Sequence, residues 1–194
     1  MQRFGLLGYP IAHSLSPSLF KAGYDGRYDY ELVEQEDFDT AWRIFLKRYQ
    51  AVNVTAPFKE LAFEKAKIRS RECELIGAAN ILVQTPKGVS AWNSDCTGVA
   101  ALLRKAFGEA EVVIYTASAP LWTVLPEEPL ARGPKILIEA NYRNPSFSAD
   151  LLSRICPETE LVRGEEWLLM QAVTGYSLMT GRNPDSAAMA AVLK

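Results

Sequence analysis

The feature that most constrains this chain is the alternation of short apolar runs with stretches of helical periodicity along its 194 residues. Strand-like runs occupy residues 3–7, 28–34 and 51–55, and residues 38–49 carry apolar side chains at helical spacing. Such alternation is typical of an α/β fold, in which helices cover the faces of a sheet. The sequence therefore predicts an α/β protein.

The same pattern continues to the end of the chain. Residues 80–84 and 89–92 predict a hairpin around Pro86-Lys87-Gly88. Ser16-Pro17 and Pro57 are expected to open helices, with Ser16 as a cap of the first and with Phe58, Leu61 and Ala62 on one face of the second. Further strands are expected at residues 112–115 and 136–140, further helices at 97–107, 148–156, 167–180 and from Asn183-Pro184-Asp185 toward Leu193, and a loop at 117–134.

The composition excludes several classes of function. The net charge is −2 and there is no basic stripe, so nucleic acid is not an expected partner. No apolar run approaches the ~18 residues that cross a bilayer, and the first residues lack the layout of a signal peptide, so we expect a cytoplasmic location. Three separated cysteines and the single His13 fit neither a disulfide framework nor a metal site.

Four polar clusters lie where predicted strands end and helices begin, which is where α/β proteins bind ligands. The first is His13-Ser14-Leu15-Ser16-Pro17. The hydroxyls of Ser14 and Ser16 can bind a carboxylate, and the positive end of the following helix favours an anion there. The alternative is that Ser16 caps the helix while Ser14 is solvated.

The second cluster is Asn53-Val54-Thr55-Ala56-Pro57-Phe58-Lys59. Lys59 falls in the first turn of a predicted helix, where the field of the helix favours a lysine that exchanges protons. The alternative is that Lys59 is a solvated surface lysine and that Thr55 only precedes the helix.

The third cluster combines Gly77-Ala78-Ala79-Asn80 with Trp92-Asn93-Ser94-Asp95-Cys96-Thr97-Gly98, at the ends of the predicted hairpin. Asn80 can donate to and accept from a hydroxyl, whereas Asp95 can accept a proton or pair with Lys59; the alternative is that Asp95 or Thr97 caps the next helix. In the fourth cluster, Gln171 interrupts an apolar helix. A buried amide needs a partner, so Gln171 either faces a polar ligand or bonds to backbone.

The order of these motifs resembles the shikimate dehydrogenase family. Ser-x-Ser-Pro, Asn-Val-Thr-x-Pro-Phe-Lys, Gly-Ala-x-Asn, Asn-x-Asp-x-x-Gly and Leu-Leu-x-Gln follow one another as they do in that family, well over residues 1–107 and more loosely over 136–181. The resemblance implies a shikimate-binding domain at residues 1–97, completed by C-terminal helices at 165–194. It also implies a reduced Rossmann-like domain at residues 98–164.

The resemblance further implies roles for single residues. Lys59 and Asp95 match the catalytic pair, and the implied reaction is reduction of 3-dehydroshikimate to shikimate by NADPH, a step of aromatic amino acid biosynthesis. The two early serines match positions that bind the substrate carboxylate, and the remaining matches bind its hydroxyls and carboxylate. The implied substrate-binding residues are Ser14, Ser16, Thr55, Asn80, Tyr142 and Gln171.

The second half of the chain departs from this family. A Rossmann unit carries a glycine-rich turn that binds the cofactor pyrophosphate. Residues 112–118 resemble a later strand of that unit and not its first, so about two strand–helix steps of ~30 residues each are missing. If residues 112–115 are instead the first strand, the turn after them, Thr116-Ala117-Ser118-Ala119-Pro120, has no glycine. NADP is the cofactor that the resemblance implies, but no residue can be assigned to bind it.

Two alternatives follow from this departure. The protein could bind shikimate without a cofactor, as a pseudoenzyme or regulatory binding protein. It could instead form a homo-oligomer in which a partner subunit supplies the cofactor site, because a sheet edge left open by missing strands favours pairing. In every case the expected ligand is shikimate or 3-dehydroshikimate, with no membrane or nucleic acid involved.

Overall fold

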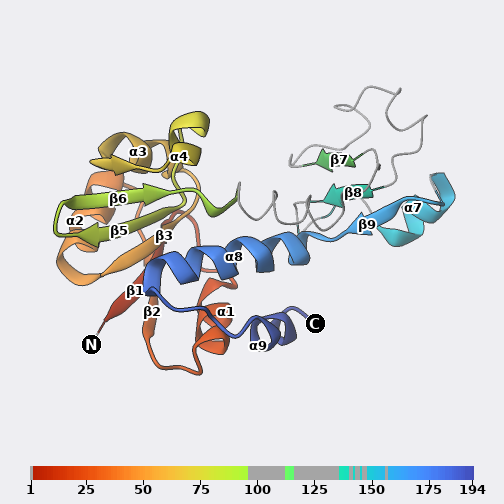
Figure 1. Ribbon diagram of the computed structural model, residues 1–194, viewed down its shortest axis with the longest axis horizontal. Coiled ribbons are helices and arrows are strands. Elements are labelled where there is room, and N and C mark those ends of the chain that lie inside the picture. The colour runs from red at the N-terminus through yellow and green to blue at the C-terminus, as the bar shows by residue number, and fades with distance from the viewer. Residues whose placement is uncertain are drawn as a thin grey trace. The chain divides into compact units, whose positions relative to one another are not determined.

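The computed structural model describes residues 2–95, 112–115, 136–139, 142, 145, 148–155 and 157–194. The chain divides into two compact units, the first made of Met1–Thr97 with Gln171–Lys194 and the second of Gly98–Met170. Each unit has its own sheet, flanked by helices (Figure 1). The α/β fold predicted from the sequence is therefore confirmed.

The sheet of the first unit has six strands in the order β2-β1-β3-β5-β6-β4. Strand β1 pairs in parallel with β2 and β3, whereas β3 and β5 are antiparallel, and β5 and β6 form the predicted hairpin. The short β4 pairs in parallel with β6 at the edge of the sheet. The strands are β1 (Arg3–Gly8), β2 (Asp29–Glu34), β3 (Ala51–Val54), β4 (Ile68–Arg69), β5 (Ile81–Thr85) and β6 (Gly88–Trp92).

Helices of the first unit begin and end at residues suited to those positions. The side chain of Asp37 accepts a hydrogen bond of 2.7 Å from the backbone N–H of Thr40 at the start of α2, and Lys47 and Arg48 lie in its last turn. The negative charge at the start of the helix and the positive charges at its end are each opposite in sign to the helix dipole there, and both stabilise the helix. The helices are α1 (Ser16–Gly23), α2 (Phe38–Arg48), α3 (Lys59–Lys65), α4 (Arg71–Ile76), α9 (Ser186–Val192) and the part of α8 (Gly164–Thr180) that begins at Gln171.

Side chains of each strand alternate between the two faces of the sheet, and this alternation divides the core. One face carries Val52 and Val54 of β3, which pack with α2 and α3. The opposite face carries Asn53 of β3 and Phe4 of β1, beside an aromatic cluster from β1, β2, α1 and α8. That cluster consists of Phe4, Phe20, Tyr24, Tyr28, Tyr30 and Tyr176.

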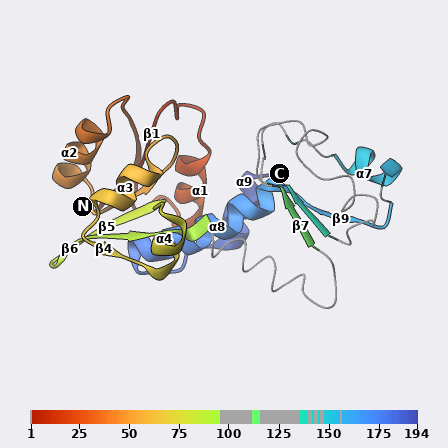
Figure 2. The ribbon, with the colours of Figure 1, turned by 90° about the horizontal axis from the view of Figure 1, so that it is seen from above.

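The C-terminal segment packs against the start of the chain. Asp185 caps α9 by accepting from the backbone N–H groups of Ala187 and Ala188, as the predicted helix start required. The backbone N–H of Asp185 also donates to the carbonyl of Gly23 in α1, at 2.8 Å. A Cβ at Gly23 would lie 2.9 Å from the sulfur of Met189, so only glycine lets α1 and α9 approach this closely (Figure 2).

Several helix starts differ from the prediction. Leu15, and not Ser16, is the capping residue of α1, and Ser16 is its first helical residue. Helix α3 begins at Lys59, two residues after Pro57, and Leu61 is 43% exposed whereas Phe58 and Ala62, expected on the same face, are buried. In both segments proline lies close to the helix start, but its fixed φ angle suits several of the first positions and does not select one.

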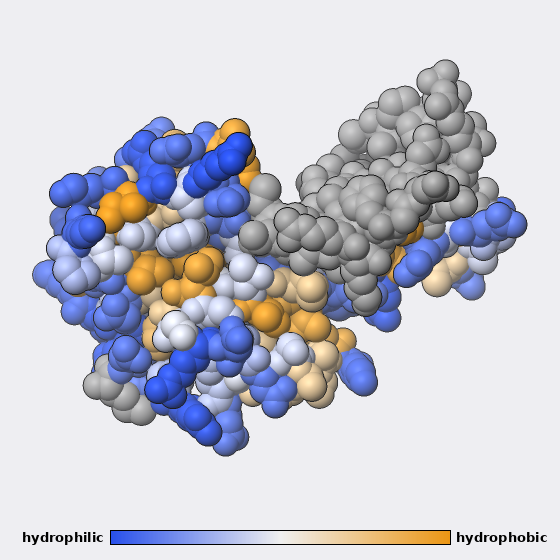
Figure 3. Space-filling model, viewed as in Figure 1, coloured by the Kyte–Doolittle hydropathy of each residue, from blue (hydrophilic) through white to orange (hydrophobic). Residues whose placement is uncertain are grey.

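Two short elements of the first unit, β4 and α4, were not predicted. Ser70 caps α4 by accepting from the backbone N–H of Cys73 at 3.3 Å, and Gly77 ends it at a φ of +72°. Helix α4 leaves Leu75 and Ile76 76% and 48% exposed, and Figure 3 shows an apolar area there. Because these apolar residues face solvent, their spacing does not give the pattern of a buried helix face.

The second unit contains a parallel three-stranded sheet in the order β7-β8-β9. Its described core joins Ile136, Ile138 and Val162 with Trp167 and Met170. The strands predicted at residues 112–115 and 136–140 are confirmed, whereas strand β9 was not predicted. The helix predicted at 97–107 and the loop predicted at 117–134 lie outside the described residues. The elements are β7 (Val112–Tyr115), β8 (Ile136–Glu139), α7 (Ala149–Ile155) and β9 (Glu160–Val162).

Among the residues that the structure describes, every helix is too short or too polar to span a membrane.

Candidate active site

The structure brings Lys59 and Asp95 into direct contact. The Nζ atom of Lys59 donates to Oδ2 of Asp95 at 2.7 Å, and the two side chains are 36% and 26% exposed. Lys59 is the first residue of α3, and its carbonyl accepts from the backbone N–H of Ala79 at 2.9 Å. The pair therefore lies at the surface of the first unit, with its lysine anchored to the segment that leads into β5.

A side-chain and backbone network fixes the position of Asp95. The Nδ2 atom of Asn93 donates to the carbonyl of Ala78 at 3.0 Å, while its Oδ1 atom accepts from the backbone N–H of Asp95 at 3.1 Å. Asn93 is 6% exposed. These two hydrogen bonds join the end of β6 to the segment before β5. Because Lys59 also bonds to that segment through Ala79, the backbones of Lys59 and Asp95 are held close together.

Asn80, Ser94 and Gln171 form a second network beside this pair. Asn80 Nδ2 donates to Ser94 Oγ at 3.0 Å, the backbone N–H of Ser94 donates to Asn80 Oδ1 at 2.8 Å, and Ser94 Oγ donates to Gln171 Oε1 at 3.3 Å. Asn80 is 3% exposed and Ser94 is fully buried. The partner of Gln171 is therefore the side chain of Ser94 and not a backbone group. A buried hydrogen-bond network of this kind fixes the orientation of the side chains in it.

Ser14 and Ser16 lie after the carboxyl end of β1. Ser14 Oγ donates to Ser16 Oγ at 3.1 Å and accepts from the backbone N–H of Ser16 at 3.2 Å. Both residues are half-buried. The carbonyl of Ser16 accepts from the hydroxyl of Tyr176 on α8 at 3.1 Å, which holds the start of α1 against that helix.

Tyr30 and Tyr176 are site neighbours that the sequence analysis missed, and Tyr30 contacts Asn53 of the second polar cluster. The hydroxyl of Tyr30 donates to Asn53 Oδ1 at 2.9 Å. Burial, and next the neighbouring Tyr176, raise the pKa of Tyr30 well above its ordinary value, so its hydroxyl remains a donor. The one signal in the sequence was Asn53 itself, an amide inside a strand whose four residues are all buried.

Gly175 joins these two groups of residues. It lies one turn after Gln171 on α8, and a Cβ there would lie 3.1 Å from Ser94 Oγ and 3.5 Å from Asn53 Nδ2. The missing side chain lets α8 approach the ends of β3 and β6. The network around Asn80 and the group around Asn53 therefore lie side by side in the first unit.

The two other predicted site residues are Thr55 and Tyr142. Thr55 follows β3 directly and is half-buried, with its backbone N–H donating to the carbonyl of Leu7 at 2.9 Å. Tyr142 belongs to the second unit. The substrate-binding roles of both residues stay predictions.

The chemistry available in the first unit defines a class of protein. Paired hydroxyls, amides and a lysine–carboxylate pair suit a small, hydroxylated carboxylate, and the lysine can transfer a proton to an oxygen of that ligand. An α/β sheet that carries such groups after the carboxyl ends of its parallel strands is typical of enzymes that act on small polar metabolites.

Comparison with known proteins identifies the family. Residues 6–82 match the model of the shikimate dehydrogenase substrate binding domain. The shikimate dehydrogenase (NADP(+)) of Legionella pneumophila is 37% identical over 105 residues, and that of Chromohalobacter salexigens is 34% identical over 191 residues. The chain belongs to the shikimate dehydrogenase family, as its motifs predicted.

The coverage of these matches differs between the two relatives. The Legionella match covers 51% of this chain and 40% of the relative, and the Chromohalobacter match covers 92% and 65%. The chain therefore spans less than two thirds of the length of either relative.

Solved structures agree on the fold. A shikimate 5-dehydrogenase from Thermus thermophilus, solved in complex with NADP(H) and shikimate, covers 100% of this chain and 98% of its own, with a TM-score of 0.77 and 22% identity. A 5-ketofructose reductase of Gluconobacter also aligns, with a TM-score of 0.75 and 17% identity, over 99% of this chain and 97% of its own. The same fold therefore serves more than one substrate.

Proposed function

We propose that this protein binds shikimate and 3-dehydroshikimate around Lys59 and catalyses their NADPH-dependent interconversion, a reaction of aromatic amino acid biosynthesis. The observation that carries the proposal is the 2.7 Å contact of Lys59 Nζ with Asp95 Oδ2, next to the network of Asn80, Ser94 and Gln171. The relatives that bear this activity in their names support the choice of substrate.

Each part of the site has one role in this proposal. Ser14 and Ser16 donate hydrogen bonds to the substrate carboxylate. Hydrogen bonds from hydroxyl groups to a charged acceptor are stronger than those to a neutral one. Thr55, Asn80 and Gln171 bind the hydroxyls of the ring, and Tyr142 approaches the carboxylate. Because the buried members are already held by one another, few side chains lose freedom when the ligand binds.

Reduction of the ring carbonyl to a hydroxyl requires a hydride at carbon and a proton at oxygen. Lys59 Nζ donates the proton and stabilises the negative charge that develops on the oxygen. Asp95 holds the ammonium group of Lys59 in place through its 2.7 Å hydrogen bond, and the lysine regains its proton from water. The hydride is the chemistry that NADPH supplies when bound.

The residues that follow β7 do not fit a pyrophosphate cradle. Strand β7 ends at Tyr115 and pairs in parallel with β8, as the strands of a Rossmann unit do. The next residues, Thr116-Ala117-Ser118-Ala119-Pro120, include no glycine that would let backbone approach the phosphates closely. We therefore assign proton transfer to Lys59 and assign cofactor binding to no residue.

That mismatch favours a second candidate function. In it the protein binds shikimate in the first unit and transfers no hydride, acting as a binding or regulatory protein. The first unit contains every proposed substrate-binding residue except Tyr142, so this function needs nothing from a cofactor site.

Calorimetric titration of the purified protein with shikimate and, separately, with NADP tests both candidates. Binding of both ligands, together with oxidation of shikimate when NADP is added, supports the dehydrogenase. Binding of shikimate alone supports the second candidate. If neither ligand binds, both proposals are wrong.

A matched pair of variants ties the result to the site. Lys59→Ala removes the proposed proton donor, whereas Lys87→Ala removes a lysine from the turn between β5 and β6. Lys59→Ala should lose turnover, and Lys87→Ala should keep it. Equal loss in both variants would contradict a specific role for Lys59.

A further inference from the structure

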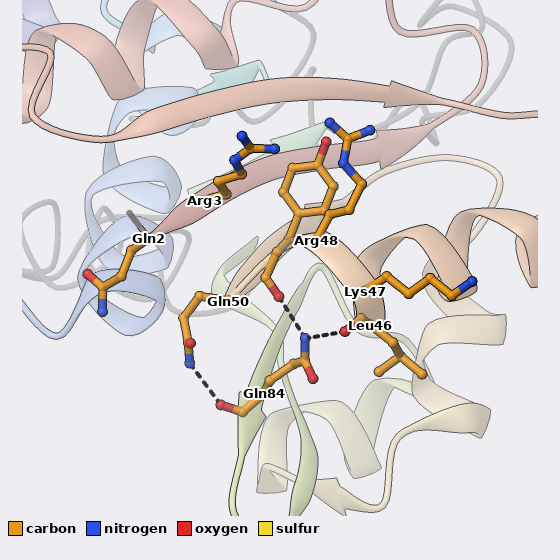
Figure 4. Close-up of a pocket in the computed structure, with 8 residues that line it drawn as sticks. Gln2, Arg3, Leu46, Lys47, Arg48, Gln50 and Gln84 are labelled. Atoms are coloured by element: carbon orange, nitrogen blue, oxygen red, sulfur yellow. Dashed lines mark hydrogen bonds between the residues drawn. The ribbon is translucent and has the colours of Figure 1, made fainter.

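A pocket of about 510 Å³ lies at the end of the first unit's sheet opposite to Lys59 (Figure 4). It is formed by the start of β1, the end of α2, the residue before β3 and the end of β5. Lys59 and Ser14 follow the carboxyl ends of β3 and β1, whereas this pocket lies at their amino ends. The six residues of β1 separate the two places by on the order of 20 Å, so one small ligand cannot reach both.

Three cations line this pocket, and no carboxylate does. They are Arg3, Lys47 and Arg48, in a chain whose net charge is −2. Arg48 pairs at 3.4 Å with Glu31, which lies outside the lining. Within the described ranges neither Arg3 nor Lys47 makes an ion pair, so two positive charges are left in excess. Figure 4 shows the guanidinium groups of Arg3 and Arg48 on the same side of the pocket.

Two of the carbonyl groups that would repel an anion here already accept hydrogen bonds. The end of a helix exposes carbonyl oxygens and the negative end of its dipole. Gln84 Nε2 donates to the carbonyl of Tyr49 at 2.7 Å and to that of Leu46 at 3.1 Å, which caps the end of α2. Gln50 Nε2 in turn donates to the carbonyl of Gln84 at 3.0 Å. These bonds leave fewer carbonyl oxygens to repel an anion in the pocket.

Tyr49 adds no negative charge to the pocket. Its hydroxyl donates to Glu31 at 2.5 Å, and burial, followed by that hydrogen bond, raises the pKa of Tyr49 to about 12. The side chain is therefore neutral near pH 7. Its hydroxyl shares the Oε2 atom of Glu31 with Arg48.

We propose that this pocket binds the phosphate group of a phosphate monoester, held by Arg3, Lys47 and Arg48. A phosphate monoester carries about −1.5 to −2 charge at pH 7, which matches the two excess positive charges better than a single carboxylate does. Guanidinium groups recognise phosphate oxygens through paired N–H donors. The volume leaves room for the organic part of a small metabolite.

Calorimetry on the full chain tests the proposal, with glycerol 3-phosphate, inorganic phosphate and glycerol as probes. Glycerol 3-phosphate should bind one site with a Kd of about 1 mM or tighter, more tightly than inorganic phosphate, and glycerol should not bind. Equal affinity for the two phosphates would overturn the assignment to a monoester. Absence of saturation by about 10 mM glycerol 3-phosphate would overturn the site itself.

Charge-matched variants separate this pocket from general attraction to a positive surface. Arg3→Gln and Lys47→Gln should each weaken binding about tenfold, the scale of a lost hydrogen bond to a charged group. Arg43→Gln removes the same charge from α2, at a residue whose hydrogen bond goes to Thr40, and should change the Kd less than about twofold. Equal weakening by all three would overturn the proposal.

The outcome does not depend on the proposed dehydrogenase activity. Shikimate affinity should be the same in Arg3→Gln as in the parent protein, because Arg3 lies at the other end of β1 from Ser14. A change of shikimate affinity in Arg3→Gln would show that the two ends are one site and would overturn the proposal.

Discussion

The two ends of the six-stranded sheet hold their polar groups in different ways. After the carboxyl ends of β1 and β3, Asn80 and Ser94 are buried and bonded to each other and to Gln171. At the amino ends, Arg3 and Lys47 are exposed, and no ion pair holds them within the described part of the chain. One end is ordered before a ligand arrives, and the other is ordered by the ligand.

This difference follows from the cost of burial. A buried amide or hydroxyl must have a partner, so residues that lie deep in the fold are fixed by their neighbours. An exposed arginine or lysine keeps its rotamer freedom until it binds, and that freedom is lost on binding. We therefore expect tight, selective recognition at the carboxyl end and weaker recognition at the amino end.

The strongest test of this comparison is Lys59→Ala, for which we expect turnover to fall by about a thousandfold or more. Shikimate binding should be weakened but measurable, because the other ligand-binding residues remain in place. Steady-state kinetics and calorimetry on the same protein provide the two readings. Unchanged turnover would remove Lys59 from the mechanism.

A second test removes both hydroxyls that face the proposed carboxylate. The double variant Ser14→Ala and Ser16→Ala should weaken shikimate binding by on the order of 1–3 kcal/mol, the scale of lost hydrogen bonds to a charged group. Calorimetric titration measures the loss. Unaltered affinity would place the carboxylate elsewhere and would break the contrast between the two ends.

A third test compares stability at the two ends. Asn80→Ala should lower the free energy of unfolding by about 2 kcal/mol, because the buried backbone N–H of Ser94 loses Asn80 Oδ1 as its acceptor and the Ser94 hydroxyl keeps Gln171 but loses Asn80. Gln50→Ala, at an exposed residue of the opposite end, should lower it by less than about 0.5 kcal/mol. Urea unfolding of both variants checks the contrast, and equal losses would show that burial does not distinguish the ends.

The smallest effect concerns Tyr49, a buried ionisable group of the amino end. Its pKa is raised from 10.0 to about 12, so the folded state favours the protonated form. That contribution to stability is complete below pH 10.0 and is lost as the pH rises through about 12. In Tyr49→Phe the urea midpoint should fall less steeply across this window than in the parent protein. Parallel curves would contradict the assignment.

Sequence patterns predicted most of the first unit because its apolar residues repeat with the period of strands and helices. Strands β1, β2 and β3 and helix α2 are confirmed close to their expected ends. The misses have physical causes. Helix α4 turns Leu75 to solvent, and β4 and β9 are two and three residues long, too short for a periodic signal.

The sequence predicted the residues of the candidate site that belong to motifs, but not the residues that lie beside them in the fold. Lys59 and Asp95 were expected to pair, and they do. Tyr30 and Tyr176 were not singled out, because a single tyrosine within an apolar pattern predicts a residue of the hydrophobic core. Only their hydrogen bonds to Asn53 and to the carbonyl of Ser16 show that they border the site.

The sequence by itself determined the α/β class, the placing of Lys59 at the start of a helix and the family to which the chain belongs, because those depend on local periodicity and on the order of short motifs. The tertiary structure decided which distant residues meet. Ser94 and Gln171 are 77 residues apart in the chain and lie 3.3 Å apart in the fold. A hydrogen bond requires an approach of about 3 Å, and that approach depends on how closely α8 packs at Gly175, which no local pattern encodes.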